Sequence, residues 1–152
     1  EICACLVGSE MCIRDRCFEN NIFPYAIKPN IDELKEIADS ESDDVMKLIS
    51  VSHMETIPMV IVSKGAEGCF AKMGSEIYTA KVPRIEAINP TGSGDSTVGA
   101  LAFAFEHGLS NENILRSAMA AGESNALEEK IGYLTDVNYE KYYKQIDVKK
   151  IN

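Results

Sequence analysis

The sequence predicts a layered α/β fold, in which helices cover a sheet that contains at least one fully buried strand. Two observations lead to this prediction. From Tyr25 onward, short apolar runs alternate with segments in which apolar residues recur at helical spacing. One of the short runs, residues 59–62, is entirely apolar, which is typical of a strand covered on both faces. Strands interleaved with helices therefore favour a sheet with helices packed against it.

The first predicted elements are a short strand and two helices. Residues 25–28 are expected to form the strand, which ends because Pro29 follows it. Asn30 is the expected N-cap of the first helix, since Glu33 stands three residues later and an apolar stripe follows. Residues 43–51 form the second predicted helix, with their apolar side chains on one face.

The rest of the chain predicts further strands followed by three helices. After the apolar strand, the expected hairpin and one more strand occupy residues 68–72, 76–81 and 84–88. The predicted helices are 95–107, which ends before Gly108, then a helix that Ser110 caps and that runs to about residue 128, and a last helix around residues 137–146.

Length, composition and charge exclude several classes of protein. The chain has 152 residues, about one domain, with 45% hydrophobic and 26% charged residues, which excludes a disordered or collagen-like chain. No run of about 18 apolar residues is present, so no membrane span is expected. The net charge of −9 disfavours nucleic acid and anionic membranes as partners. A site for an anion would need backbone amides and a few placed cations.

The cysteines predict a reducing compartment rather than a metal site. Four of the five fall within the first 17 residues, but their C-x-C-x6-C-x4-C spacing fits no zinc pattern well and no histidine is close. The odd total and the lack of a signal-peptide layout favour the cytoplasm.

Residues 1–17 differ from the rest of the sequence, because they show neither helical nor strand periodicity. An ordinary, poorly ordered N-terminus is one interpretation. The stretch CLVGSEMCIRDR also resembles a translated library-adapter sequence, in which case it has no biological role. Under both interpretations, we expect residues 1–17 to be dispensable for folding.

The most informative stretch is the glycine-rich turn between residues 89 and 96. It follows a predicted strand and precedes a helix, so its amides and the helix N-terminus can together bind an anion. Asp95 at this position could accept a proton from a hydroxyl group that attacks a phosphoryl group. The alternative is a plain turn in which Asp95 caps the helix. No G-x-x-x-x-G-K-[ST] motif is present, so the chain is not a P-loop protein.

The longer string NPTGSGDSTVGAL resembles the signature of the ribokinase-like carbohydrate kinases, in the phosphofructokinase-B branch. Further stretches match in the expected order: AIKPNIDEL at 26–34, VIVSKGAEGCFAK at 60–72 and VPRIEAINP at 82–90. Within the branch, the strings are most similar to those of the tagatose-6-phosphate kinases. The resemblance covers residues 18 to about 147. It implies that residues 18–152 form the C-terminal nucleotide-binding half of a ribokinase-like domain. A sugar-binding Gly-Gly-Lys-Gly-x-Asn stretch and a β-sheet lid, which belong to the upstream half, are absent from the sequence.

The resemblance also implies a reaction. The γ-phosphoryl group of ATP would pass to the 1-hydroxyl of tagatose 6-phosphate, with Asp95 as the catalytic base and Gly92, Ser93 and Gly94 as an anion hole. The alternatives are 1-phosphofructokinase, another sugar-phosphate kinase of the branch, or an inactive nucleotide-binding remnant. ATP and Mg²⁺ are the implied cofactors, and the full-length enzyme would form a homodimer.

Further residues are implied at the ATP site and the metal site. The residues that would contact ATP come from several elements: Lys28, Ser63, Gly65, Gly68 and, as a weaker candidate at the adenine end, Asn125. Asn30 and Glu33 match a pair that handles Mg²⁺ and phosphate, although the same spacing is also a capping box. The alternative for Lys28 is an ordinary exposed lysine at the end of a strand.

Overall fold

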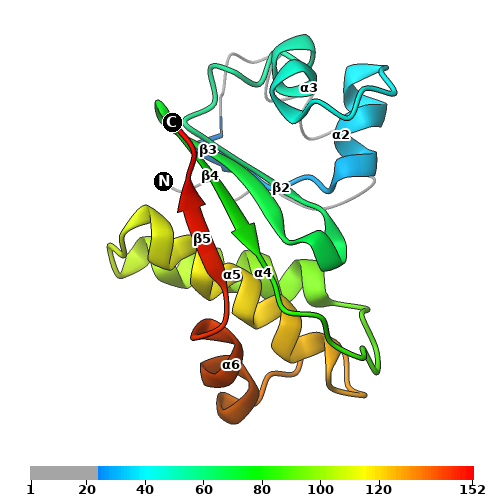
Figure 1. Ribbon diagram of the computed structural model, residues 1–152, viewed down its shortest axis with the longest axis vertical. Coiled ribbons are helices and arrows are strands. Elements are labelled where there is room, and N and C mark those ends of the chain that lie inside the picture. The colour runs from blue at the N-terminus through cyan, green and yellow to red at the C-terminus, as the bar shows by residue number, and fades with distance from the viewer. Residues whose placement is uncertain (1–23) are drawn as a thin grey trace.

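The computed structural model describes residues 24–152, and its centre is a mixed sheet of five strands (Figure 1). The strands lie in sequence order and are β1 (Ala26–Ile27), β2 (Met59–Ser63), β3 (Cys69–Met73), β4 (Glu76–Lys81) and β5 (Asp147–Lys150). β1 and β2 are parallel, and the other neighbouring strands are antiparallel. The carboxyl ends of β1 and β2 therefore meet at one edge of the sheet, where the candidate site lies.

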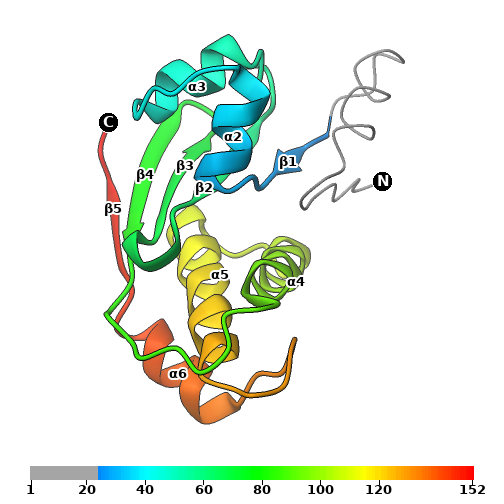
Figure 2. The same cartoon turned by 90° about the vertical axis from the view of Figure 1, so that its right-hand side faces the viewer.

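Helices cover both faces of the sheet, which confirms the predicted layered α/β fold (Figure 2). The helices are α2 (Ile31–Ala38), α3 (Val45–Val51), α4 (Ser93–Glu106), α5 (Asn111–Ala126) and α6 (Asp136–Tyr143). α2 and α3 lie on one face, α4 and α5 on the other, and α6 contacts α5.

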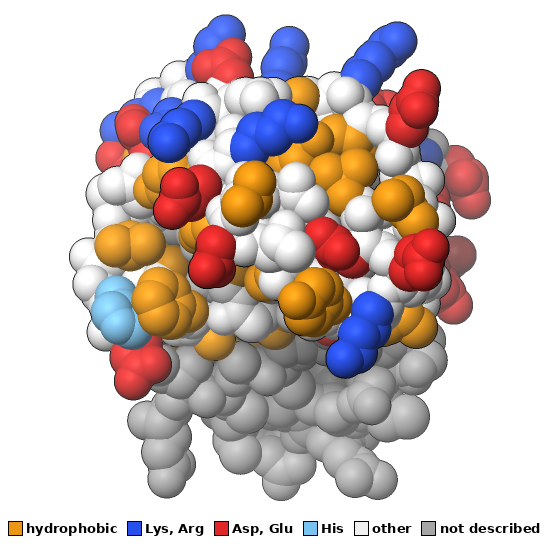
Figure 3. Space-filling model, turned by 90° about the horizontal axis from the view of Figure 1, so that it is seen from below, with side chains coloured by type: hydrophobic (Ala, Val, Ile, Leu, Met, Phe, Trp, Pro, Cys, Tyr) orange, Lys and Arg blue, Asp and Glu red, His pale blue; other side chains and the backbone are white. Residues whose placement is uncertain are grey.

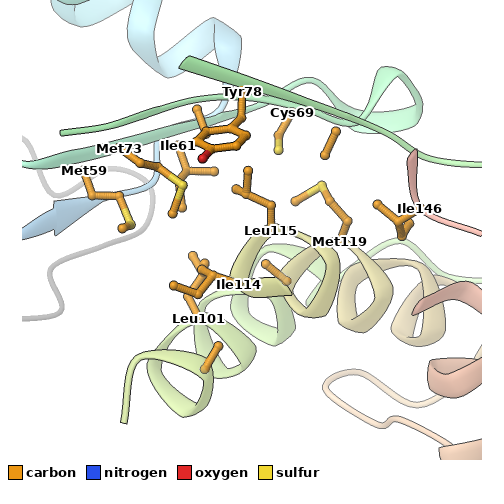
Figure 4. Close-up of a cluster of buried hydrophobic side chains, with 14 residues drawn as sticks. Met59, Ile61, Cys69, Met73, Tyr78, Leu101, Ile114, Leu115, Met119 and Ile146 are labelled. Carbon is orange, nitrogen blue, oxygen red and sulfur yellow. The ribbon is translucent and has the colours of Figure 1, made fainter. Parts of the chain in front are cut away.

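Strand β2 shows why its sequence is apolar throughout. Met59 and Ile61 face the core beneath α4 and α5, whereas Val60 and Val62 face α2 and α3. Because successive side chains of a strand point to opposite faces, a strand between two layers needs apolar residues at every position. Figure 4 shows the first of these cores, in which side chains from α4 and α5 meet those of the sheet.

The predicted strand at residues 84–88 is wrong. This segment has no regular secondary structure, and no strand of the sheet pairs with it. The N–H groups of Ile88 and Asn89 instead both donate to the carbonyl of Ala126, at 2.8 and 3.1 Å. Pro83 cannot donate a ladder hydrogen bond, which helps to end β4 before this segment. The segment therefore leads from the sheet to the C-terminal end of α5.

Strand β5 was not predicted from the sequence, because DVKK carries little apolar pattern. It lies at the edge of the sheet and pairs with β4, where Val148 faces the core while its neighbours are exposed. The start of α4 also differs from the prediction, since the helix begins at Ser93 instead of Asp95.

The structure bears on the expectations about membrane spans and surface charge, but only for residues 24–152. Within residues 24–152, no helix has the length and apolar character needed to cross a membrane. Figure 3 shows the end of the molecule that carries α6, where acidic side chains are interspersed with basic and apolar ones. Residues 1–17, with their four cysteines, lie outside the described residues, so the predictions on them stay predictions.

Candidate phosphate-binding site

The centre of the site is the N-terminus of α4. Gly92 is the N-cap residue, and no side chain caps the helix at this end. Within the turn before the helix, the N–H of Thr91 donates to Oδ1 of Asn89 (3.0 Å) and the N–H of Ser93 donates to the carbonyl of Pro90 (3.1 Å). The amides of Gly94 and Asp95 and the positive end of the helix dipole therefore remain for an anion.

Gly92 is required in this turn for two reasons. Its φ angle is +84°, in the left-handed region that favours glycine. A Cβ atom here would also lie 2.7 Å from Cγ2 of Ile131 and 3.1 Å from the backbone nitrogen of Gly132. Gly94 is different, because its φ is not positive, and a Cβ atom would lie 3.9 Å from Nζ of Lys28. This distance places the lysine directly beside the helix N-terminus.

Lys28 is buried, which excludes the interpretation of an ordinary exposed lysine. It follows β1, its exposed fraction is 8%, and its Nζ donates to Oγ of Ser63 at 3.3 Å. Burial lowers the pKa of Lys28, while the negative charges of Glu33 and Asp95 oppose that shift. Among residues 24–152, a hydroxyl is the hydrogen-bond partner of this buried cation, which suits it to bind an anion at the adjacent helix N-terminus.

Asn30 and Glu33 form the predicted capping box at the start of α2. The Oδ1 of Asn30 accepts from the N–H of Glu33, and Oε2 of Glu33 accepts from the N–H of Asn30, both at 2.8 Å. Asn30 also forms a parallel bridge with Ser63. Within residues 24–152, no group of three His, Cys, Asp or Glu side chains could hold a metal ion by itself. A role for this pair with Mg²⁺ stays a prediction.

Ser63 is the last residue of β2, so the end of this strand places it at the same edge of the sheet. A short 3₁₀ helix (Gly65–Glu67) follows, and the N–H of Lys64 donates to the carbonyl of Gly68 at 2.8 Å. Gly65 and Gly68 have φ angles of +54° and +90°, so both shape the turn through their backbones. Ser63 acts through its side chain, which contacts Lys28.

Asp95 and Asn125 lie in contrasting environments. Asp95 is the third residue of α4 and is exposed, and since no side chain caps this helix, the interpretation of Asp95 as its cap is wrong. Asn125 is fully buried near the end of α5, and its amide is hydrogen-bonded to two loops beside the site. One of these loops includes Gly132, a residue that no sequence pattern identifies as part of the site.

Two parallel strands that end beside an uncapped helix N-terminus and a buried lysine define an α/β protein with a candidate phosphate site. Comparison with known proteins is more specific. The pattern of the pfkB family of carbohydrate kinases matches residues 16–133. The chain therefore belongs to this family, whose members are phosphotransferases.

The relatives support this assignment and show how much of a kinase is present. The chain is 38% identical over 133 residues to a tagatose-6-phosphate kinase from Staphylococcus epidermidis, covering 85% of this chain and 43% of that protein. A protein from Staphylococcus aureus assigned as a phosphofructokinase superposes with a TM-score of 0.76 and 32% identity, covering 86% of this chain and 43% of the other. A mutant of phosphofructokinase-2 from Escherichia coli superposes with a TM-score of 0.78 and 25% identity, covering 93% of this chain and 46% of the other. The chain thus spans less than half the length of these relatives.

Proposed function

We propose that residues 18–152 are the nucleotide-binding half of an ATP-dependent sugar-phosphate kinase. The observation that carries this proposal is the position of buried Lys28 beside the uncapped N-terminus of α4, because amides and a cation at one point favour a phosphate group. Ser63 lies in the same place and contacts the lysine. The phosphates of ATP would bind here, with Gly65 and Gly68 shaping the adjacent turn.

Asp95 is the proposed catalytic base. Its carboxylate would take the proton from the sugar hydroxyl as that oxygen attacks the γ-phosphorus and the bond to ADP breaks. Because the side chain of Asp95 is exposed and does not cap α4, it is free for this role. Gly92, Ser93 and Gly94 form the proposed anion hole for the transferring group. Because the N–H of Ser93 donates to Pro90, the amide of Gly94 would stabilise the negative charge most directly.

The residues present fit Mg²⁺ only as an ion shared with phosphate oxygens. Mg²⁺ typically binds through one or two carboxylates, water and the phosphates of the substrate, where it neutralises their charge. The negative charge of Glu33 acts on Lys28, so this carboxylate faces the proposed phosphate position. One of its oxygens is engaged in the capping box, so Glu33 and Asn30 would contact the ion indirectly.

The proposed acceptor is the 1-hydroxyl of tagatose 6-phosphate, which gives tagatose 1,6-bisphosphate in lactose and galactose breakdown in the cytoplasm. The support is the 38% identity to a tagatose-6-phosphate kinase. Similarity to phosphofructokinases favours a fructose phosphate as the second candidate. Acceptor choice depends on the upstream half, so the reading frame upstream of residue 1 is the decisive observation. A Gly-Gly-Lys-Gly-x-Asn stretch there supports the enzyme. A genuine start at residue 1 supports an inactive remnant.

The test of the catalytic role uses a complete kinase, made by joining the upstream part of the Staphylococcus epidermidis relative to residues 18–152. Asp95→Asn should lower turnover by roughly 10²–10⁴-fold, because an amide cannot accept the proton. ATP affinity should hold or improve slightly, since a negative charge beside the phosphates is removed. The matched control is Asp136→Asn, which removes an acid from the first turn of α6. Turnover of the Asp95 variant within about threefold of the parent would show that another residue is the base.

A further inference from the structure

We infer that Asn125 is a positioning residue that couples the anion-binding turn to a second loop, residues 127–135, so that a ligand bound at one is sensed at the other. The inference rests on the proposed function, because the ligand it concerns is ATP or its phosphate chain. It assigns to Asn125 an action through two loops, in place of direct contact with the adenine end.

The first observation is that every hydrogen-bonding position of the Asn125 amide is used. Its Nδ2 donates to the carbonyl of Thr91 at 2.9 Å and to Oγ of Ser93 at 3.1 Å. Its Oδ1 accepts from the N–H of Gly132 at 2.7 Å and from Oγ of Ser96 at 3.4 Å. A primary amide has two donors and two acceptor positions, so all four are satisfied.

The second observation is that the anion-binding turn and the second loop need opposite ends of the amide. The Nδ2 donates to the turn at the Thr91 carbonyl, whereas Oδ1 accepts from the second loop at Gly132, and both ends also contact serines of α4. Since Asn125 is fully buried, these contacts are formed away from water, where losing one is costly. A residue with only acceptors, or only donors, cannot hold both loops.

The third observation is that the two loops are in direct contact. A Cβ atom on Gly92 would lie 2.7 Å from Cγ2 of Ile131 and 3.5 Å from Oδ1 of Asn125. A shift of the second loop toward the turn would therefore press on the backbone that supplies the anion-binding amides. The neighbouring residue strengthens this arrangement, because Oγ of Ser124 accepts from the N–H of Thr135 at 3.3 Å.

The second loop also offers a surface that a ligand could use. Ile131 and Tyr133 are 59% and 47% exposed, although both are large and apolar or aromatic. A ligand with phosphates at the α4 amides and an apolar part on this loop would contact two elements whose relative position Asn125 sets. Rigid placement of the two in advance lowers the entropy lost on binding.

Substitution by aspartate separates the two halves of this contact. Asn125→Asp keeps the oxygen that accepts from Gly132 but removes both donors, and it places a negative charge beside the anion site. We expect the contact to the second loop to persist while the bond to the Thr91 carbonyl is lost, because a carboxylate and a carbonyl both only accept. The Ser93 hydroxyl can still donate to the new carboxylate, so the bond to Thr91 is the one that this variant tests. Ser117→Ala is the matched control, because Ser117 is also buried on α5 and bonds to Tyr139 OH at 2.8 Å, on the side of the helix that faces α6.

The experiment measures amide hydrogen exchange of the 152-residue chain with and without saturating inorganic tripolyphosphate, a probe that has phosphates but no base. In the wild type and in Ser117→Ala, the probe should slow exchange at residues 89–95 and also at residues 127–135. In Asn125→Asp, exchange at residues 127–135 should no longer respond, and affinity for the probe should fall at least tenfold. Asn125→Ser, which keeps a small polar side chain but cannot span both loops, should behave likewise and serves if the aspartate variant does not fold.

The outcomes separate this inference from the proposed function. A probe that binds the wild type and protects residues 89–95 alone would overturn the coupling but leave the nucleotide-binding proposal intact. The same holds if residues 127–135 respond equally in the wild type and in the Asn125 variants. Failure of both tripolyphosphate and ATP to bind the wild type would overturn the proposed function and this inference together.

Discussion

Gly68, in the turn after β2, is the position where a single added methyl group should damage the proposed nucleotide site most. Its φ angle is +90°, and a Cβ atom would lie only 1.9 Å from the carbonyl oxygen of Ala80 on β4. The added Cβ atom is fixed to the backbone of residue 68, and the oxygen belongs to the backbone of Ala80. Neither atom can therefore rotate away as the end of a side chain could. Gly68→Ala must therefore displace the turn from β4 or strain it in place.

The size of the effect follows from two contributions. Forcing a residue with a Cβ atom into left-handed helical geometry costs about 1–2 kcal/mol. Gly68, at φ +90° and ψ −129°, lies outside that region, in geometry whose cost is at least as large. Overpacking in a site that cannot relax costs typically about 1–3 kcal/mol more. Gly74 provides the matched control, because its φ is +64° but a Cβ atom there meets nothing within 4 Å. We expect Gly74→Ala to show the backbone contribution alone and Gly68→Ala to show both, about 2–5 kcal/mol in total.

Urea denaturation of the three proteins, followed by circular dichroism, measures this difference. The urea midpoint should be highest for the wild type, lower for Gly74→Ala and lowest for Gly68→Ala. ATP affinity should fall for the Gly68 variant only, since the Lys64 to Gly68 hydrogen bond closes the turn beside the site. Equal loss of stability in the two variants would refute the reasoning, because it would mean that the turn moves away from β4 without cost.

Three other predictions concern titratable groups. Lys28→Met should leave the melting temperature unchanged or higher while ATP affinity falls at least tenfold, because a buried charge is replaced by an apolar side chain of similar size. Hydrogen bonds from Lys150 and Tyr78 lower the pKa of Glu76 from 4.5 to about 2. The carboxylate of Glu76 therefore stabilises the fold fully above its unfolded pKa, and this contribution is lost as pH falls toward 2. Glu76→Gln should therefore reduce the pH dependence of the urea midpoint in that window, and an unchanged dependence would contradict the assignment. Burial raises the pKa of Cys69 to about 12, so mass spectrometry should find its peptide unmodified by iodoacetamide at pH 8 until urea unfolds the chain.

The local parts of this fold could be predicted from the sequence. The capping box at Asn30, the buried strand at residues 59–62 and the hairpin around Gly74 depend on residues a few positions apart, and the structure confirms all three. The glycine-rich turn before α4 was predicted for the same reason, since its geometry depends on its own glycines. Local patterns also predicted the layered architecture, because strand and helix periodicity show which faces must be buried.

The tertiary structure decided what the side chains of the site do. Burial of Lys28 depends on Ser63 and on α4, and the bonds of Asn125 reach residues 34 positions earlier. No local pattern records such contacts, so the sequence left Lys28 open as an exposed residue and Asn125 as a weak candidate. The errors at residues 84–88 and 147–150 have the same cause, since a strand exists only where a partner strand is placed beside it. Local sequence thus set the turns and caps, whereas long-range packing determined which of these residues meet at the proposed phosphate site.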